Sequence, residues 1–337
     1  MTVEDLEKEL KSGILSGIYL LYGEETYFLE STINKIKKIF GELINGINYI
    51  TIDEKNVSEI ISDIETPAFG YNKKLIIVKN LGLFKRIIKN KDVNNIKDKL
   101  LNYLEENINI INDTVNIVFI EDSADKTKFL DFISKNGKVC NFEKMKPDAI
   151  IKKLKSICNS YKVNVSETTL KKLLEVSGTS MQELVNEIRK LIEYVGQDGT
   201  ITEEDIENLS TKNIESVIFD LTDNLGSKNI SKAIEVLNNL IDNKEPVQVI
   251  LITLYRHFKK LYIIKNCEKE NLDIIENLQL KPNQTFLVSK YKKQAQYFQV
   301  DVLEKILSEL TKLDANSKSG LINLQVGLES ILCNYCY

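Results

Sequence analysis

Short runs of consecutive apolar residues alternate with helix-like segments through the first 142 residues, and this alternation is the strongest constraint on the fold. The runs are expected strands, at Ile18–Tyr22, Tyr49–Ile52, Lys74–Val78, Val115–Ile120 and Val139–Phe142. The segments between them repeat apolar residues every three or four positions, which is typical of amphipathic helices. The alternation predicts β-α-β units and a doubly wound α/β domain, with a mostly parallel sheet covered on both faces.

The strand signal stops after Lys146-Pro147, and the rest of the chain has helical spacing. Pro147-Asp148 is a typical helix start, and Thr202-Glu203-Glu204-Asp205 predicts another helix whose N-terminus is capped. We therefore expect an α/β domain over residues 1–142, a small helical domain over 143–210 and a larger all-α domain over 211–337. Helix breaks in the last domain are expected near Gly226, Asn243, Asn266 and Pro282.

The composition supports a folded protein and disfavours some classes. The chain has 337 residues, 43% hydrophobic and 28% charged, which suits two or three domains. Its formal net charge of -4 disfavours a protein that acts by binding nucleic acid alone. It has no apolar run of about 18 residues, and Glu4 and Asp5 stand where a signal peptide would be basic. We expect a cytoplasmic protein with no membrane partner.

Cysteine and histidine do not form a recognisable metal or catalytic pattern. The chain has five cysteines and one histidine, and an odd, scattered set of cysteines disfavours a disulfide framework. Cys333 and Cys336 form a C-x-x-C pair without the second pair that a structural zinc site needs. His257 lies between Arg256 and Phe258 on an expected helix and is interpreted as a structural or surface residue. No catalytic residue, metal or cofactor is expected.

An α/β domain followed by a small helical domain is the arrangement of AAA+ ATPases, which place the motif G-x-x-x-x-G-K-[ST] after the first strand. Here that position reads Gly23-Glu24-Glu25-Thr26-Tyr27-Phe28-Leu29, without the lysine or the second glycine. The two carboxylates would repel a triphosphate. The alternative is a simple turn at Gly23 with acids at a helix N-terminus. Both interpretations predict that Gly23, Glu24 and Glu25 bind no nucleotide.

Glu121-Asp122 follows the expected strand at Ile120, where such an ATPase would hold magnesium with an acidic pair. Without a phosphate-binding lysine, magnesium has nothing to bridge. We interpret this acidic pair as a solvated strand end.

The segment Thr66-Pro67-Ala68-Phe69-Gly70-Tyr71-Asn72 joins an expected helix to an expected strand. Two aromatic residues flank a glycine in a loop that should be exposed. Exposed aromatic side chains on a rigid loop are good anchors for a partner's pocket. The alternative, equally compatible with the spacing, is that Phe69 or Tyr71 folds back onto the sheet edge.

In their order and spacing, these segments resemble the family of bacterial DNA polymerase III delta subunits over nearly the full chain. The similar segments are Gly17–Glu25, Thr66–Gly70 with Lys73–Val78, Glu183–Leu191, Ile201–Ile206, Phe219–Asp223, Leu254–Leu261 and Ala315–Gly320. The resemblance implies an AAA+-like domain without a working phosphate loop, a small helical lid-like domain and an all-α collar domain used for oligomerisation.

The resemblance also implies a function and a site. Members of the family bind and open the beta sliding clamp for loading onto primed DNA, and ATP hydrolysis belongs to partner subunits. The chain would then be a non-catalytic subunit of a DNA-directed DNA polymerase holoenzyme, assembled with delta-prime and tau/gamma subunits. Carried over here, the clamp-contacting pair is Ala68 and Phe69, with Gly70 and Tyr71 beside it. Lys318 is the expected DNA-facing residue in the assembled loader.

One departure affects this site. Family members often have a larger aliphatic residue where Ala68 stands, and alanine buries less area, worth about 1–2 kcal/mol. Phe69 must then carry more of the contact, or Tyr71 contributes to it. Three other functions stay open: an active AAA+ ATPase, a stand-alone nucleic-acid-binding protein and a scaffold unrelated to replication.

Overall fold

The computed structural model describes all residues except 89, 281 and 336–337, and the side chains of residues 282 and 283 are also outside the description. Cys336 of the C-x-x-C pair therefore lies outside the described residues. The chain divides into two compact units, Met1–Lys144 and Met145–Tyr337. The further division of the second unit at residue 210 stays a prediction.

The first unit is built on a five-stranded parallel sheet with the strand order β2-β3-β4-β1-β5. The strands are β1 (Ile18–Tyr22), β2 (Tyr49–Ile52), β3 (Lys74–Lys79), β4 (Val115–Glu121) and β5 (Lys138–Asn141). Each of the five runs expected to be a strand forms one, and the expected parallel sheet is confirmed.

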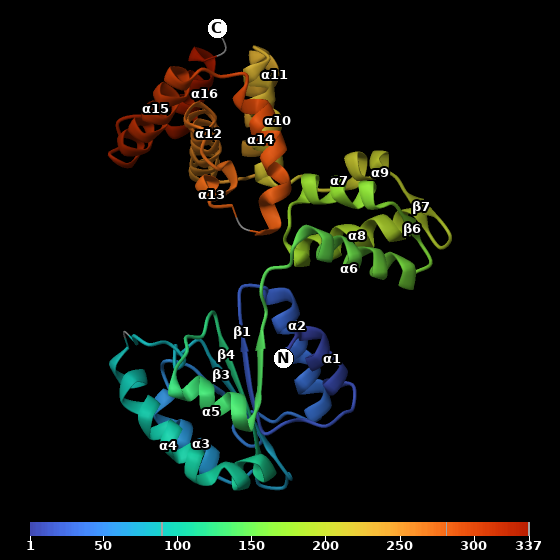
Figure 1. Cartoon of the computed structure of the whole chain (residues 1–337), viewed down its shortest axis with the longest axis vertical. Coiled ribbons are helices and arrows are strands. Elements are labelled where there is room, and N and C mark those ends of the chain that lie inside the picture. Colours follow the sequence, from blue (N-terminus) through green and yellow to red (C-terminus); the bar gives the residue numbers. More distant parts are fainter. Residues whose placement is uncertain (89, 281, 336–337) are drawn as a thin grey trace. The chain divides into compact units, whose positions relative to one another are not determined.

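Helices cover both faces of this sheet (Figure 1). They are α1 (Val3–Leu10), α2 (Thr26–Phe40), the 3-10 helix η1 (Val57–Glu59), α3 (Ile60–Glu65), α4 (Lys91–Thr114) and α5 (Lys128–Asn136). Alternate residues of each central strand enter different cores. Leu20 and Phe119 pack with α3, α4 and α5, whereas Tyr19 and Val118 pack with α1 and α2. Burial on two faces explains why these strands are apolar without interruption.

Two helices of the first unit differ from the sequence expectation. Helix α1 was not expected, although the spacing of Thr2 and Asp5 carries a capping-box signature that the structure forms. Helix α4 was expected only over Ile96–Leu104. It is longer because Asn90 caps its start and Ile111 continues its buried face between polar residues.

The second unit is helical, with a two-stranded parallel ladder. Its elements are α6 (Pro147–Ser160), β6 (Asn164–Val165), α7 (Glu167–Ser177), α8 (Met181–Val195), β7 (Thr200–Ile201), α9 (Glu203–Leu209), α10 (Ile214–Gly226), α11 (Ile230–Asp242), α12 (Val247–Glu270), α13 (Ile274–Leu278), η2 (Pro282–Leu287), α14 (Val288–Ala295), α15 (Val300–Lys318) and α16 (Leu324–Asn334). The expectation that no strand follows Pro147 was wrong. Strands of two residues are too short to carry an apolar run.

Helix α12 lies at the centre of the core formed by α10–α16 and contacts α10, α13, α14, α15 and α16. The expected breaks at Gly226 and Asn243 are confirmed, but the one at Asn266 was wrong. Helix α12 continues through Asn266 because Ile264 and Cys267 keep its buried face packed. Among the described residues, no helix is long and apolar enough to cross a membrane.

His257 of α12 is a core residue. Its Nε2 lies 2.8 Å from Oε1 of Gln294, whose Nε2 donates to the carbonyl oxygen of Phe219. Burial lowers the pKa of His257 to about 3. The imidazole is therefore neutral at pH 7, and it ties α12 to α14 and, through Gln294, to α10. This agrees with the structural interpretation of His257 and gives it no role as a base.

Candidate partner-binding site

The two edges of the parallel sheet carry the two regions that the sequence singles out. Segments that lead into strands meet at the amino-terminal edge, and segments that leave strands meet at the carboxyl-terminal edge. The loop 66–73 precedes β3 and lies at the amino-terminal edge. Gly23–Glu25 follows β1 and lies at the carboxyl-terminal edge. The structure therefore places the two regions at opposite edges of one sheet.

The loop 66–73 holds Phe69 at its tip. Thr66 caps the C-terminus of helix α3, and its backbone N–H donates to Ser62 O at 3.0 Å. The backbone N–H of Tyr71 donates to Ala68 O at 2.9 Å, which closes a tight turn. Gly70 has a φ of 82° in this turn, a region that favours glycine. The side chain of Phe69 is 78% exposed.

A buried lysine fixes the base of the loop. Lys74, the first residue of β3, is only 2% exposed. Its Nζ donates to Asp63 O at 2.7 Å and also to Thr66 O, so it binds the C-terminal carbonyls of α3, where a cation is favourable. Burial lowers the pKa of Lys74, although nearby Asp63 opposes the shift. This role of Lys74 was not predicted from the sequence, although a charged residue that opens an otherwise apolar run is a usable signal.

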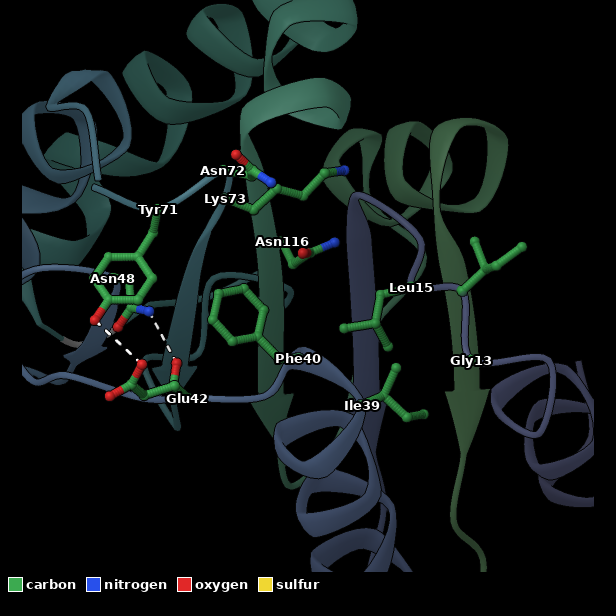
Figure 2. A pocket seen from close by; sticks show the side chains of 11 residues that line it. Gly13, Leu15, Ile39, Phe40, Glu42, Asn48, Tyr71, Asn72, Lys73 and Asn116 are labelled. Atoms are coloured by element: carbon green, nitrogen blue, oxygen red, sulfur yellow. Dashed lines mark hydrogen bonds between the residues drawn. The ribbon is translucent and has the colours of Figure 1, made fainter. Parts of the chain in front are cut away.

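The two aromatic residues of the loop behave differently. Phe69 is exposed, as expected of a binding anchor, whereas Tyr71 folds back onto the domain. The Tyr71 hydroxyl donates to Glu42 Oε2 at 3.4 Å. Figure 2 shows Tyr71, Asn72 and Lys73 beside a hollow whose opposite side is formed by Leu15, Ile39 and Phe40.

A second hollow adjoins the same loop on its other side. Ala68 and Tyr71 line it together with Tyr103 and Ile110 of α4. Ala68 is half-buried and Gly70 is exposed. The four candidate residues thus belong to one loop. The side chain of Phe69 is exposed, Ala68 next to it is half-buried, and Tyr71 is held by its hydrogen bond to Glu42.

At the carboxyl-terminal edge, the turn after β1 is packed against the domain. Only Gly23, Glu24 and Glu25 separate β1 from α2. The backbone N–H of Gly23 donates to Glu121 O at 3.2 Å, and that of Glu25 to Phe142 O at 2.9 Å. A Cβ at Gly23 would lie 2.3 Å from Phe142 O. These two N–H groups therefore face protein carbonyls, whereas a phosphate-binding loop would turn them toward its ligand.

Of the three glutamates singled out at this edge, Glu25 and Glu121 are buried, whereas Glu24 is exposed. Glu25 is 7% exposed, and burial raises its pKa. Glu121 is 3% exposed and accepts from Gly82 N at 2.8 and 2.9 Å and from Leu83 N at 3.1 Å. Burial raises the pKa of Glu121 to about 7. The interpretation of Glu121 as part of a solvated strand end was therefore wrong, because its carboxylate binds the backbone of the loop after β3.

The remaining candidate, Lys318, ends helix α15 of the second unit. Its Nζ lies 2.7 Å from Asp314 Oδ2, and its side chain is 67% exposed. Its role toward DNA stays a prediction. Within the described part of the chain, no three His, Cys, Asp or Glu side chains are grouped so that they could hold a metal ion.

Comparison with known proteins gives consistent matches over both units. A family model described as "DNA polymerase III, delta subunit" matches residues 19–143, and one described as "DNA polymerase III delta subunit, C-terminal domain" matches residues 215–335. The chain is 26% identical over 313 residues to a probable DNA polymerase III subunit delta of Aquifex aeolicus, covering 89% of this chain and 86% of that protein.

A curated sequence and a solved structure from Bacillus subtilis both match almost end to end. The chain is 24% identical over 353 residues to the DNA polymerase III subunit delta, covering 98% of this chain and 96% of that protein. The solved structure of the DNA clamp loader delta protein aligns with a TM-score of 0.68 and 21% identity over 99% of both chains. This likeness and the parallel sheet confirm the expected fold class, an AAA+-like α/β domain followed by helical domains.

Proposed function

Because the chain belongs to the family of DNA polymerase III delta subunits, we propose that it binds and opens the beta sliding clamp and does not itself hydrolyse ATP. Membership of the family implies a part in clamp loading during DNA replication. The observation that carries the proposal is the exposed Phe69 at the tip of a braced loop. Ala68, Gly70 and Tyr71 complete the proposed contact.

The loop has the properties of a binding anchor. A Phe side chain that is 78% exposed leaves apolar surface in contact with water. Removal of that surface from water by a partner would be favourable. The loop's own hydrogen bonds and the Lys74 ammonium already fix its backbone. Less conformational entropy is therefore lost on binding than with a free loop. Such preorganised aromatic anchors carry much of the binding energy of protein interfaces.

Clamp opening would follow from differential binding. A ligand shifts a conformational equilibrium only by the difference between its affinities for the two states. If Phe69 and its neighbours fit the clamp surface better when one subunit interface of the ring is open, binding stabilises the open ring. A rigid loop suits this task because it cannot adapt equally well to both states of the clamp.

The carboxyl-terminal edge supports the proposal that this chain does not use ATP. Backbone N–H groups of Gly23 and Glu25 donate to protein carbonyls, and Glu25 is buried at the start of α2. A triphosphate would have to displace these hydrogen bonds and approach a buried carboxylate. ATP hydrolysis then belongs to the tau/gamma subunits of the loader.

The second unit would join the collar of the assembled loader. Its helices α10–α16 share one core, and we propose that they contact the delta-prime and tau/gamma subunits. Lys318 would approach the phosphates of primed DNA there. It could exchange its ion pair with Asp314 for a phosphate contact, since lysine binds phosphate as a point charge.

Calorimetric titration of the cognate sliding clamp tests the proposal. We expect the wild-type chain to bind and Phe69→Ala to lose at least about 2 kcal/mol, roughly a thirtyfold loss of affinity. The matched control is Ile87→Ala, because Ile87 is 83% exposed but follows β3 at the other edge of the sheet. Equal binding by wild type and Phe69→Ala would place the contact elsewhere, and no binding by the folded wild type would contradict the function itself.

A further inference from the structure

Exposed apolar side chains occur in the segments before four of the five strands. Ile14 precedes β1, Ile47 precedes β2, Phe69 precedes β3, and Ile110 lies in the last turns of α4, just before β4. Their side chains are 73%, 40%, 78% and 64% exposed, respectively. Because all five strands are parallel, these four side chains belong to one edge of the sheet.

The strand order places them in a row. Strands β2, β3, β4 and β1 are neighbours in that order, so the row runs Ile47, Phe69, Ile110, Ile14. Neighbouring strands are about 4.8 Å apart, so four strands extend over roughly 15 Å. We call these four residues the amino-edge strip. In the described part of the first unit, Ile87 is the strongly exposed apolar residue that follows a strand instead.

Two hollows connect the Phe69 loop to the rest of the strip. The hollow on the α4 side is lined by Ala68, Tyr71 and Ile110. The other, shown in Figure 2, is lined by Tyr71, Asn72 and Ile14. The loop therefore shares one concave surface with Ile110 and another with Ile14.

The usual area of a protein interface indicates that a clamp bound at Phe69 also covers the strip. One buried Phe side chain contributes about 150–250 Å², whereas a stable, specific interface buries about 800 Å² on each partner. Phe69 alone accounts for less than a third of that area, so a clamp seated on Phe69 must cover its neighbours. Those neighbours along the sheet edge are the exposed apolar residues of the strip and the two hollows.

We propose that the sliding clamp contacts the whole amino-edge strip, with Ile110 and Ile14 as further anchors on one side of Phe69 and Ile47 on the other. This inference rests on the proposed function and extends its site from one loop to four segments. Clamp side chains would enter the two hollows while Phe69 enters the clamp. Contact along a row of anchors would fix the orientation of the clamp, which a single inserted side chain leaves free to rotate.

Titration of the sliding clamp with Ile110→Ala, Ile14→Ala and the double variant tests the inference. We expect each single substitution to weaken binding about fivefold and the double variant more than tenfold. Ile87→Ala should bind as wild type does. The substituted residues are exposed, and an unchanged circular dichroism spectrum and melting temperature would confirm that each variant is folded.

The outcomes separate this inference from the function on which it rests. If Phe69→Ala loses affinity while Ile110→Ala, Ile14→Ala and the double variant bind as tightly as wild type, the strip is overturned and the proposed function stands. If the folded wild-type chain does not bind the clamp at all, both are overturned. If Ile87→Ala weakened clamp binding as much as Ile110→Ala did, the strip would also be overturned. The loss of affinity would then not depend on the edge of the sheet at which the residue lies.

Discussion

The two edges of the sheet in the first unit differ in what their backbone and side chains contact. At the carboxyl-terminal edge, the N–H groups of Gly23 and Glu25 donate to protein carbonyls, and Glu121 is buried against Gly82 and Leu83. At the amino-terminal edge, Phe69, Ile14 and Ile110 are exposed.

Ligands of open α/β sheets usually bind at the carboxyl ends of the strands. Here that edge is filled by the chain's own groups, whereas the amino-terminal edge offers exposed apolar side chains on fixed supports. If the clamp binds at the amino-terminal edge, such a domain keeps its sheet and its helix layers while its binding surface changes edge.

Replacement of glycine by alanine should give the largest difference in the free energy of unfolding between the two edges. At Gly23 (φ 133°), a Cβ would lie 2.3 Å from Phe142 O, whereas at Gly70 (φ 82°) nothing lies within 4 Å. We expect Gly23→Ala to lower the free energy of unfolding by about 3 kcal/mol or more, and Gly70→Ala by about 1 kcal/mol. Urea denaturation of both variants measures the difference. Equal losses would contradict the tight packing inferred for the turn after β1.

Removal of the Lys74 ammonium should loosen the amino-terminal edge. Lys74→Met keeps the length of the side chain but leaves the carbonyls of Asp63 and Thr66 without this donor. We expect a loss of about 1–3 kcal/mol in stability, with faster hydrogen exchange at residues 66–73 and weaker clamp binding.

Lys73→Met is the matched control for this test. Lys73 Nζ donates to Asn112 O at 2.8 Å, away from the C-terminus of α3. A similar gain in exchange at residues 66–73 in both variants would show that Lys74 does not specifically brace the loop.

The buried carboxyl of Glu121 should give the carboxyl-terminal edge a pH dependence. Its pKa rises from 4.5 to about 7 on folding, so the folded state binds the proton more tightly. Its contribution to stability is then full below about pH 4.5 and is lost as the pH rises toward and through 7, by at most about 1.4 kcal/mol per pH unit.

Glu121→Gln should remove this decline. His257, with a pKa lowered to about 3, has the opposite effect, but it is present in both proteins and cancels in the difference between them. Urea denaturation between pH 5 and 8 measures that difference. A difference that does not change with pH would show that Glu121 stays ionised on folding.

The strands, most helices and the turn that carries Phe69 could be predicted because each depends on local sequence, whereas the spacing left open whether Phe69 or Tyr71 is exposed. Apolar runs specify buried strands, and Pro67 and Gly70 mark a turn. The resemblance added the identity of the expected site residues. What could not be predicted depends on contacts between distant segments. Glu121 is buried because the loop after β3 meets the end of β4, 39 residues away.

The role of Lys74 and the amino-edge strip were missed for related reasons. The carbonyls that Lys74 binds are 8 and 11 residues before it in the sequence, and their position depends on where α3 ends. The strip depends on the strand order, because Ile110 and Ile14 become neighbours only when β4 pairs with β1. Apolar runs predict that strands exist but do not give their order in the sheet.

Hydrogen–deuterium exchange of the chain with and without its sliding clamp tests most directly which edge binds. The account predicts protection at residues 66–73, with weaker protection at 13–15 and 107–114, and no change at 23–25 or 82–86. Protection at 23–25 and 82–86 without any at 66–73 would contradict it, because the clamp would then occupy the carboxyl-terminal edge.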